Sequence, residues 1–196
     1  MALADTRFSN RRRKLASTLS GQRIDAVIIT HLTHVRYLTG FSGSNGGLLL
    51  RKDLSALMAT DGRYTTQIAE EVPDIEAVLG RDVGPHLLGQ LSGELRVGYE
   101  ADYVSVSQLK RLEKAAPEGV TLVPVSGVIE DIRLVKDRVE LEKLEELAAL
   151  ANQALTELVE NGEVAAGRTE RQVAADLESR MRMLGSERVS FDTIVA

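Results

Sequence analysis

Short apolar segments alternate with amphipathic stretches over the first two thirds of the chain. The apolar runs are DAVIIT (25–30), GGLLL (46–50), ALMAT (56–60), DIEAVLG (74–80), LRVGYE (95–100) and VTLVPV (120–125). Helical patterns lie between them at residues 64–72 and 105–116, the second with Ser105 as its predicted N-cap. This alternation predicts an α/β domain, with a sheet covered by helices, that extends to about Val125.

Two of the apolar runs predict a hairpin. Residues 46–60 read GGLLLRKDLSALMAT, with the polar residues Arg51, Lys52 and Asp53 between two apolar strands. The segment before it, GFSGSNGG (40–47), is rich in glycine, but it lacks the lysine and hydroxyl of a phosphate-binding loop and no helix follows it. We therefore expect these glycines to form tight turns before the first strand of the hairpin.

The pattern changes after Ile129, where one long amphipathic helix is predicted over residues 137–160. Its apolar stripe recurs at steps of three and four residues and consists of Leu141, Leu144, Ala148, Ala151, Leu155 and Leu158. Asp137 and Glu140 form a capping-box pattern at its start, and Asn161-Gly162 supplies its stop. The acidic residues Glu140, Glu142, Glu145 and Glu146 fall mostly off this stripe, so we expect them to be solvated rather than to bind metal.

A second helix is predicted over residues 169–184, with Thr169 and Gln172 as its capping box and Gly185 as its stop. The last six residues, FDTIVA (191–196), have the pattern of a buried strand without a return strand. We therefore expect the chain to be part of a longer protein, and place a domain boundary near residues 131–136. The apolar stripes of both helices would be covered by further sequence or by dimerisation.

Composition limits the class of protein. The 196 residues are 43% hydrophobic and 27% charged with 4 prolines, which indicates a folded globular chain. The net charge of −5 gives no general attraction to nucleic acid or to anionic membranes. The chain has no cysteine and residues 1–14 lack the apolar run of a signal peptide, which favours the cytoplasm. The basic cluster 11–14 is expected to be a solvated helix face.

Few side chains suggest chemistry. His31 and His34 in THLTH have a metal-ligand spacing, but they follow a strand, and no acidic residue lies in the same segment. We therefore expect loop histidines that form hydrogen bonds, and His86 beside Pro85 is isolated. In TDGRY (60–64), Arg63 stands where a strand gives way to a helix. It could bind a carboxylate, or it could form a local pair with Asp61, and the residues alone leave both open.

Five segments in order resemble the N-terminal part of the creatinase/prolidase/aminopeptidase P family of pita-bread metallopeptidases. These segments are HVRYLTGFSGSNGGLLL (34–50), TDGRY (60–64), VGYE (97–100), IRLVKDRVELEKL (132–144) and GRTERQVAADLESRMRMLGSERVSFDTIVA (167–196). The resemblance implies a mixed-sheet creatinase-like N-terminal α/β domain over residues 1–131. Residues 132–196 would be the first helices and strand of an incomplete pita-bread (α+β) domain.

The resemblance also implies an activity for the full-length parent. Such enzymes cleave the bond before proline in peptides with two divalent metals, commonly manganese, cobalt or zinc. The family's ligands are two aspartates, a histidine and two glutamates, and all five fall beyond Ala196 in the family's order. The resemblance therefore assigns no catalytic residue and no metal ligand to this chain, which alone is expected to be inactive.

One binding residue is carried over. In some aminopeptidases P the arginine of the DGRY motif helps to bind substrate at the other subunit's active site, and Arg63 matches it. Tyr37, Phe41 and Asn45 are expected to be structural. We therefore interpret the chain as the N-terminal half of a homodimeric cytoplasmic Xaa-Pro aminopeptidase or dipeptidase. The alternative is a non-catalytic dimerisation or protein-binding module of the same fold.

Overall fold

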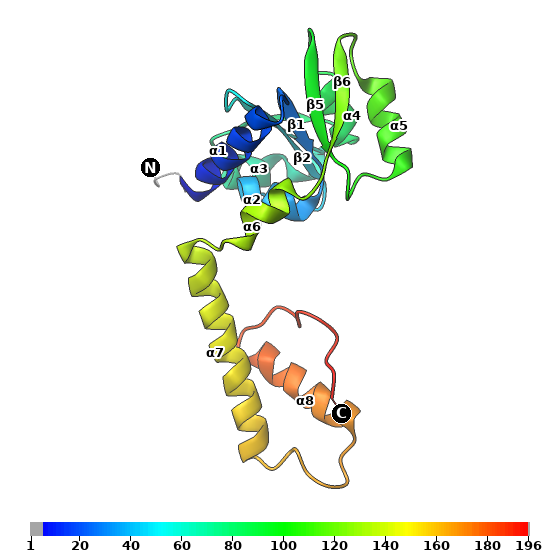
Figure 1. Ribbon diagram of the computed structural model, residues 1–196. Helices are drawn as coiled ribbons and strands as arrows, with labels where there is room; N and C mark the ends of the chain where they lie inside the picture. Colours follow the sequence, from blue (N-terminus) through cyan, green and yellow to red (C-terminus); the bar gives the residue numbers. More distant parts are fainter. Residues whose placement is uncertain (1–5, 196) are drawn as a thin grey trace. The chain divides into compact units, whose positions relative to one another are not determined.

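The computed structural model describes residues 6–195 and divides the chain into two compact units, Met1–Leu134 (unit 1) and Val135–Ala196 (unit 2). Figure 1 follows the elements along the sequence. In unit 1 they are α1 (Thr6–Gly21), β1 (Ala26–Ile29), α2 (Leu32–Thr39), β2 (Gly46–Arg51), β3 (Ala56–Thr60), the 3-10 helix η1 (Gly62–Tyr64), α3 (Thr65–Glu71), β4 (Glu76–Leu79), α4 (Val83–Leu88), β5 (Leu95–Glu100), α5 (Val106–Ala115), β6 (Val120–Val125) and α6 (Val128–Leu134). Unit 2 contains α7 (Arg138–Glu160) and α8 (Glu170–Met183).

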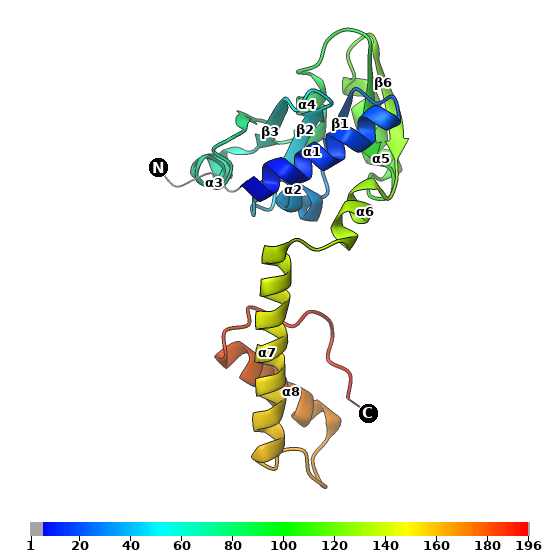
Figure 2. The ribbon, with the colours of Figure 1, turned by 60° about the vertical axis from the view of Figure 1, so that its left-hand side comes forward.

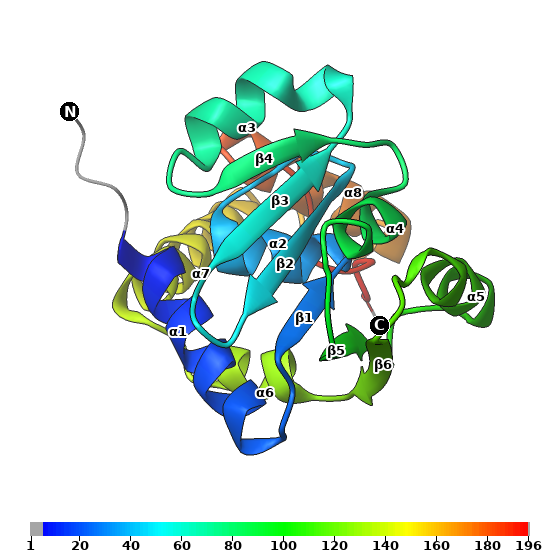
Figure 3. The ribbon, with the colours of Figure 1, turned by 90° about the horizontal axis from the view of Figure 1, so that it is seen from above.

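The six strands of unit 1 form one mixed sheet in the order β4-β3-β2-β1-β5-β6. Figure 3 shows β4, β3, β2 and β1 side by side in this order. β2 pairs antiparallel with both β1 and β3, and the other neighbours are parallel. The predicted α/β class and the predicted hairpin of β2 with β3 are therefore confirmed.

Alternate residues of the strands fill two hydrophobic cores, one on each face of the sheet. Val27 and Ile29 of β1 face the core with α1, α2 and α6, whereas Ala26 and Ile28 face the core with α4 and α5. Figure 2 shows α1 and α2 beside each other on their face of the sheet. Phe41, next to α2, is 1% exposed and is one of the largest fully buried side chains.

Two arginines of α1 are buried, so the solvated face predicted for residues 11–14 is wrong for Arg11 and Arg12. Arg11 donates from Nη1 to the carbonyl oxygen of Tyr37 at 2.9 Å, and Arg12 does the same to Leu38 at 2.9 Å. Both carbonyls belong to the last turn of α2, where a helix has no internal donors left for its carbonyl groups. Burial of these guanidinium groups therefore completes the C-terminus of α2.

Unit 2 is a pair of helices, α7 and α8, that pack on each other, and Ala154 and Leu158 of α7 are fully buried. The capping boxes predicted at Asp137 and Thr169 are both formed. The terminal strand predicted from FDTIVA is not found over residues 191–195, and Ala196 lies outside the described residues. Phe191 and Ile194 are 75% and 85% exposed, and a strand needs a partner for its backbone groups, which none of the described residues supplies.

Among residues 6–195, every helix is too short or too polar to cross a lipid bilayer. The longest, α7, carries charged residues along its length.

Candidate functional site

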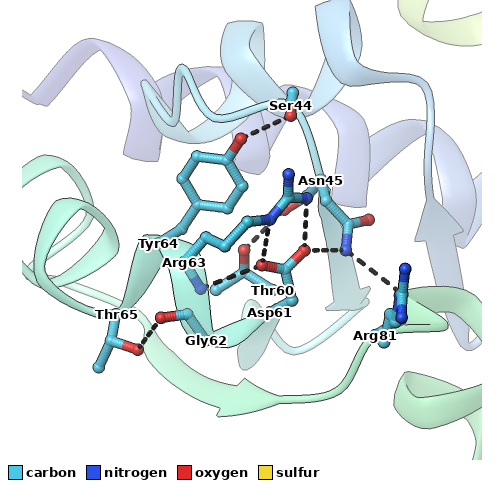
Figure 4. A network of polar contacts seen from close by, with 9 residues as sticks. All are labelled: Ser44, Asn45, Thr60, Asp61, Gly62, Arg63, Tyr64, Thr65 and Arg81. Atoms are coloured by element: carbon cyan, nitrogen blue, oxygen red, sulfur yellow. Dashed lines mark hydrogen bonds and ion pairs between the residues drawn. The ribbon is translucent and has the colours of Figure 1, made fainter.

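Polar residues gather where several strands of the sheet end at one edge. β3 and β4 are parallel, so the residues that follow them, Asp61 and Arg81, lie at the same edge, and Asn45 precedes the antiparallel β2 there. In open α/β sheets, ligands bind outside the carboxyl ends of the strands. This edge is therefore where a site is expected, and Figure 4 shows its polar network.

Arg63 is held by Asp61 in fork geometry. Its Nε donates to Oδ1 of Asp61 at 2.9 Å and its Nη2 donates to Oδ2 at 2.8 Å. Asp61 is also the N-cap of η1, because its Oδ1 accepts the backbone N–H of Arg63 at 3.1 Å. The local Arg–Asp pair, one of the two sequence alternatives, is therefore formed. The Arg63 side chain is nevertheless 66% exposed, so it is open to a ligand.

Asn45 anchors this pair to the sheet. Its Nδ2 donates to Oδ2 of Asp61 at 2.7 Å and to the carbonyl oxygen of Arg81 at 3.2 Å. Its own carbonyl oxygen accepts the Thr60 hydroxyl at 2.6 Å. Asn45 was expected to be structural, and its side chain links three loops at the edge (Figure 4).

The aromatic rings beside the network pack so closely on the neighbouring glycines that these positions have no room for a side chain. Tyr64 packs edge-on against Phe41, with 5.7 Å between ring centroids, and its hydroxyl lies 2.5 Å from Oγ of Ser44. A Cβ on Gly43 would lie 2.4 Å from the Phe41 ring and 2.9 Å from the Tyr64 ring. Gly40 has φ of 88° at the C-cap of α2, so the predicted turn role of this segment is confirmed there, and close ring packing is a second role.

The hydrogen bonds of this network lower the pKa of Asp61 and of Tyr64 and raise the pKa of Arg63. Hydrogen bonds from Arg63, and then from Asn45, hold the pKa of Asp61 well below its usual range. The hydrogen bond with Asp61 raises the pKa of Arg63 above its usual range. The hydrogen bond with Ser44 lowers the pKa of Tyr64. At neutral pH the edge therefore carries a fixed carboxylate and a fixed, solvent-facing guanidinium.

A cleft of about 220 Å³ opens beside Asn45 between α4 and α5. Its lining includes Arg81, Tyr103 and Arg111, whereas Arg63 lies outside it. Arg111 contacts Asp82 across the cleft at 3.5 Å. The structure thus places Asn45, but not the predicted binding residue Arg63, in this cleft.

The loop prediction for the two neighbouring histidines is wrong for His34, whereas His31 lies just before the helix. His31 is the N-cap of α2, and His34 lies within α2 and is 3% exposed. Nδ1 of His34 lies 2.7 Å from Oε1 of Glu100, at the end of β5. Burial, and then the neighbouring His34, lower the pKa of His31. Glu100 was missed because it lies far away in the sequence, and the predicted hydrogen bonding of His34 is confirmed.

Comparisons with known proteins identify this domain. The six-stranded mixed sheet with helices on its two faces matches the fold of creatinase-like N-terminal domains. The profile of the creatinase/prolidase N-terminal domain matches residues 11–135, and the chain belongs to that family.

Relatives extend the similarity beyond that domain. The uncharacterized peptidase YqhT of Bacillus subtilis is 33% identical over 189 residues, which are 93% of this chain and 52% of YqhT. The chain therefore spans about half the length of this relative. Among solved structures, the N-terminal creatinase/prolidase-like domain of a Corynebacterium diphtheriae protein assigned as a metallopeptidase is 57% identical. It covers 62% of this chain and 98% of its own, with a TM-score of 0.62.

Two further solved structures are similar to this chain, one over its N-terminal part and one over nearly its whole length. The N-terminal domain of the cytoplasmic peptidase PepQ from Mycobacterium tuberculosis H37Rv is 42% identical over 63% of this chain and 98% of its own, with a TM-score of 0.60. The Xaa-Pro dipeptidase of Bacillus anthracis is 26% identical, and it covers 94% of this chain and 52% of its own, with a TM-score of 0.86. The chain is thus related to the N-terminal half of Xaa-Pro dipeptidases.

Proposed function

We propose that this chain is the N-terminal part of an Xaa-Pro aminopeptidase or dipeptidase. The observation that carries the proposal is the match to the Bacillus anthracis Xaa-Pro dipeptidase over 94% of the chain, because it includes unit 2 as well as the N-terminal domain. In this proposal unit 2 is the start of a pita-bread domain, and the parent protein hydrolyses peptide bonds before proline.

The dinuclear metal centre of the family is assigned to sequence beyond this chain. Its ligand set is two aspartates, a histidine and two glutamates. Within residues 6–195, the one group of three or more potential ligands in reach of each other is His31, His34 and Glu100. That group differs from the family set, and we do not propose that it takes part in peptide hydrolysis. We expect the 196-residue chain alone to have no Xaa-Pro peptidase activity.

The first test is the intact mass of the native protein. This chain has a mass of 21.4 kDa and spans 52% of YqhT, so the proposal predicts a native polypeptide about twice as large. That polypeptide should hydrolyse Xaa-Pro substrates when manganese is added. A native mass of 21.4 kDa would contradict the proposal of an Xaa-Pro peptidase and would favour the alternative, a dimerising or protein-binding module.

Arg63 is proposed as a substrate-binding residue of the parent enzyme. A guanidinium group has five N–H donors, and Arg63 uses two of them on Asp61, so three remain for a substrate carboxylate or carbonyl. Asp61 acts as a positioning residue, because its fork fixes the direction of the guanidinium group. The side chain needs no rearrangement to accept a ligand from solvent.

This role is tested by substitution in the full-length enzyme. Arg63→Ala should raise the Michaelis constant for proline-containing peptides and leave the metal content unchanged, and Arg63→Lys should restore only part of the binding. Arg171→Ala, an exposed arginine of α8, is the matched control. An unaltered Michaelis constant in Arg63→Ala would remove this residue from the site without affecting the family assignment.

A homodimeric cytoplasmic protein is also proposed. Four leucines of α7 are about half exposed, Leu141, Leu144, Leu147 and Leu155, and α8 has no buried residue. Exposed apolar stripes of this kind favour a covering by further sequence or by a second copy. A sharp monomer in sedimentation without binding of an exposed-surface dye would contradict this expectation. The cytoplasmic location is supported by the absence of cysteine and by the similarity to PepQ.

A further inference from the structure

Glu100 organises a buried cluster at the end of β5. Its Oε2 accepts the backbone N–H groups of Thr30 at 2.7 Å and of His31 at 2.9 Å. Its Oε1 contacts Nδ1 of His34 at 2.7 Å. An ionised carboxylate only accepts hydrogen bonds, so Nδ1 of His34 carries the hydrogen. In the neutral imidazole, the lone pair therefore lies on Nε2, on the opposite side of the ring.

That second nitrogen faces further ligand groups. Nε2 of His34 lies 3.5 Å from Oε1 of Glu130, on α6. The ring of His31 stands edge-on to that of His34, with 4.4 Å between centroids, and stacks on Tyr103. A cavity of about 20 Å³ adjoins this face, and its lining includes His34, Glu100, Asp102 and Glu130. This volume is close to that of one small ion or water molecule.

The distance of 3.5 Å between Nε2 and the Glu130 oxygen is long for a charged hydrogen bond. It suits two ligands of one cation, because tetrahedral bonds of about 2.0–2.2 Å place ligand atoms about 3.3–3.6 Å apart. A carboxylate on the other ring nitrogen is the usual partner of a metal-binding histidine, since it fixes the tautomer and the ring orientation. Glu100 already holds His34 in that arrangement.

We propose that His34, His31 and Glu130 bind one divalent cation, with Glu100 as the carboxylate that orients His34. Ligand atoms of His31, His34 and Glu100 lie within 4.8 Å of one another, and Glu130 is outside that group. Cation binding would therefore have to draw the partly exposed ring of His31 toward Nε2 of His34 and toward Glu130. Imidazole and carboxylate ligands favour zinc or cobalt over magnesium and calcium, which prefer oxygen alone. The cation would join α6 to α2 and thereby stabilise unit 1.

Imidazole NMR of the 196-residue chain, prepared without a histidine tag, tests the site directly, because the chain has 3 histidines. On titration with Zn²⁺, the ring resonances of His31 and His34 should change together and saturate at one equivalent. Those of His86, on α4, should stay unchanged, and Mg²⁺ should have no effect. This readout is independent of peptidase activity. Changes confined to His86, or no change at His34 at millimolar Zn²⁺, would overturn the proposal.

Substitutions separate the site from adventitious binding. Glu130→Gln keeps the shape of the side chain and removes its charge, and should weaken Zn²⁺ binding at least about tenfold by calorimetry. His34→Asn should abolish binding, and His86→Asn, the matched control, should bind as the unaltered chain does. Because the Glu130 side chain is 51% exposed, the Gln variant should fold even if His34→Asn does not. Equal affinity in Glu130→Gln and the unaltered chain would refute the site.

Discussion

Replacing Arg12 by methionine tests whether a buried arginine of α1 completes the C-terminus of α2. The Arg12 side chain is 8% exposed, donates to the Leu38 carbonyl oxygen at 2.9 Å and forms an ion pair with Asp74. Arg13, the next residue, is exposed, and its Nη1 donates to Oδ1 of Asn10 in the same helix at 2.6 Å. Arg13→Met is therefore a control with the same change of side chain in the neighbouring position.

The expected magnitude follows from the two lost interactions. A hydrogen bond from a charged donor contributes about 1.5–3 kcal/mol, and its removal leaves the Leu38 carbonyl without that donor. The ion pair adds no more than about 1 kcal/mol, because the Asp74 side chain is 36% exposed. Arg12→Met should therefore lower the free energy of unfolding of unit 1 by about 2–4 kcal/mol. Arg13→Met should change it by no more than about 0.5 kcal/mol.

Tyrosine fluorescence during urea unfolding measures unit 1 selectively. The chain has no tryptophan, and its 4 tyrosines, at positions 37, 64, 99 and 103, all lie in unit 1. With a denaturant slope of about 2 kcal/mol per molar, the midpoint for Arg12→Met should fall by about 1–2 M urea. The midpoint for Arg13→Met should not move measurably. Equal midpoints for the two variants would refute the role of Arg12.

Three further outcomes are expected. The lowered pKa of Asp61 means that its pair with Arg63 stabilises the fold above the unfolded pKa, and that this contribution is lost as pH falls through the folded pKa. In Arg63→Ala, carboxyl NMR should find the pKa of Asp61 raised toward 3.8. Gly40→Ala should destabilise unit 1 by about 1–2 kcal/mol in urea, because φ is positive there, whereas Gly21→Ala, with open space around it, should not. Asp137→Ala should destabilise the start of α7 by about 1 kcal/mol, seen as faster amide exchange in its first turn, and Asp137→Asn should not.

Features that depend on neighbours along the chain could be predicted from the sequence. The caps at Ser105, Asp137 and Thr169 are all formed as full capping boxes, because their partners stand three residues later. The hairpin of β2 and β3 is formed because two apolar runs flank a polar turn. In each case the interaction that defines the element lies within the segment that carries the signal.

The order of strands and the buried arginines could not be predicted in this way. β5 pairs with β1 rather than with β4, so these two neighbours in the sheet are not neighbours in sequence. Arg11 and Arg12 look like any solvated basic cluster until α2, 26 residues away, presents unpaired carbonyl groups to them. For the same reason, residues 191–195 carry a strand pattern without forming a strand, since pairing depends on a partner elsewhere.

The position of Glu100 in the sequence indicates that hydrogen-bond donors lie near it in the fold. It ends an apolar strand, a position where a carboxylate is buried only if donors meet it. The donors, two backbone N–H groups and a histidine, lie 66–70 residues earlier and are brought together by the parallel pairing of β1 with β5. An acidic residue at the end of a buried strand therefore predicts that some donor set exists, but the sheet order decides which one. His31 and His34 have no acidic neighbour in sequence. The pairing of β5 with β1 places the carboxylate of Glu100 in contact with His34.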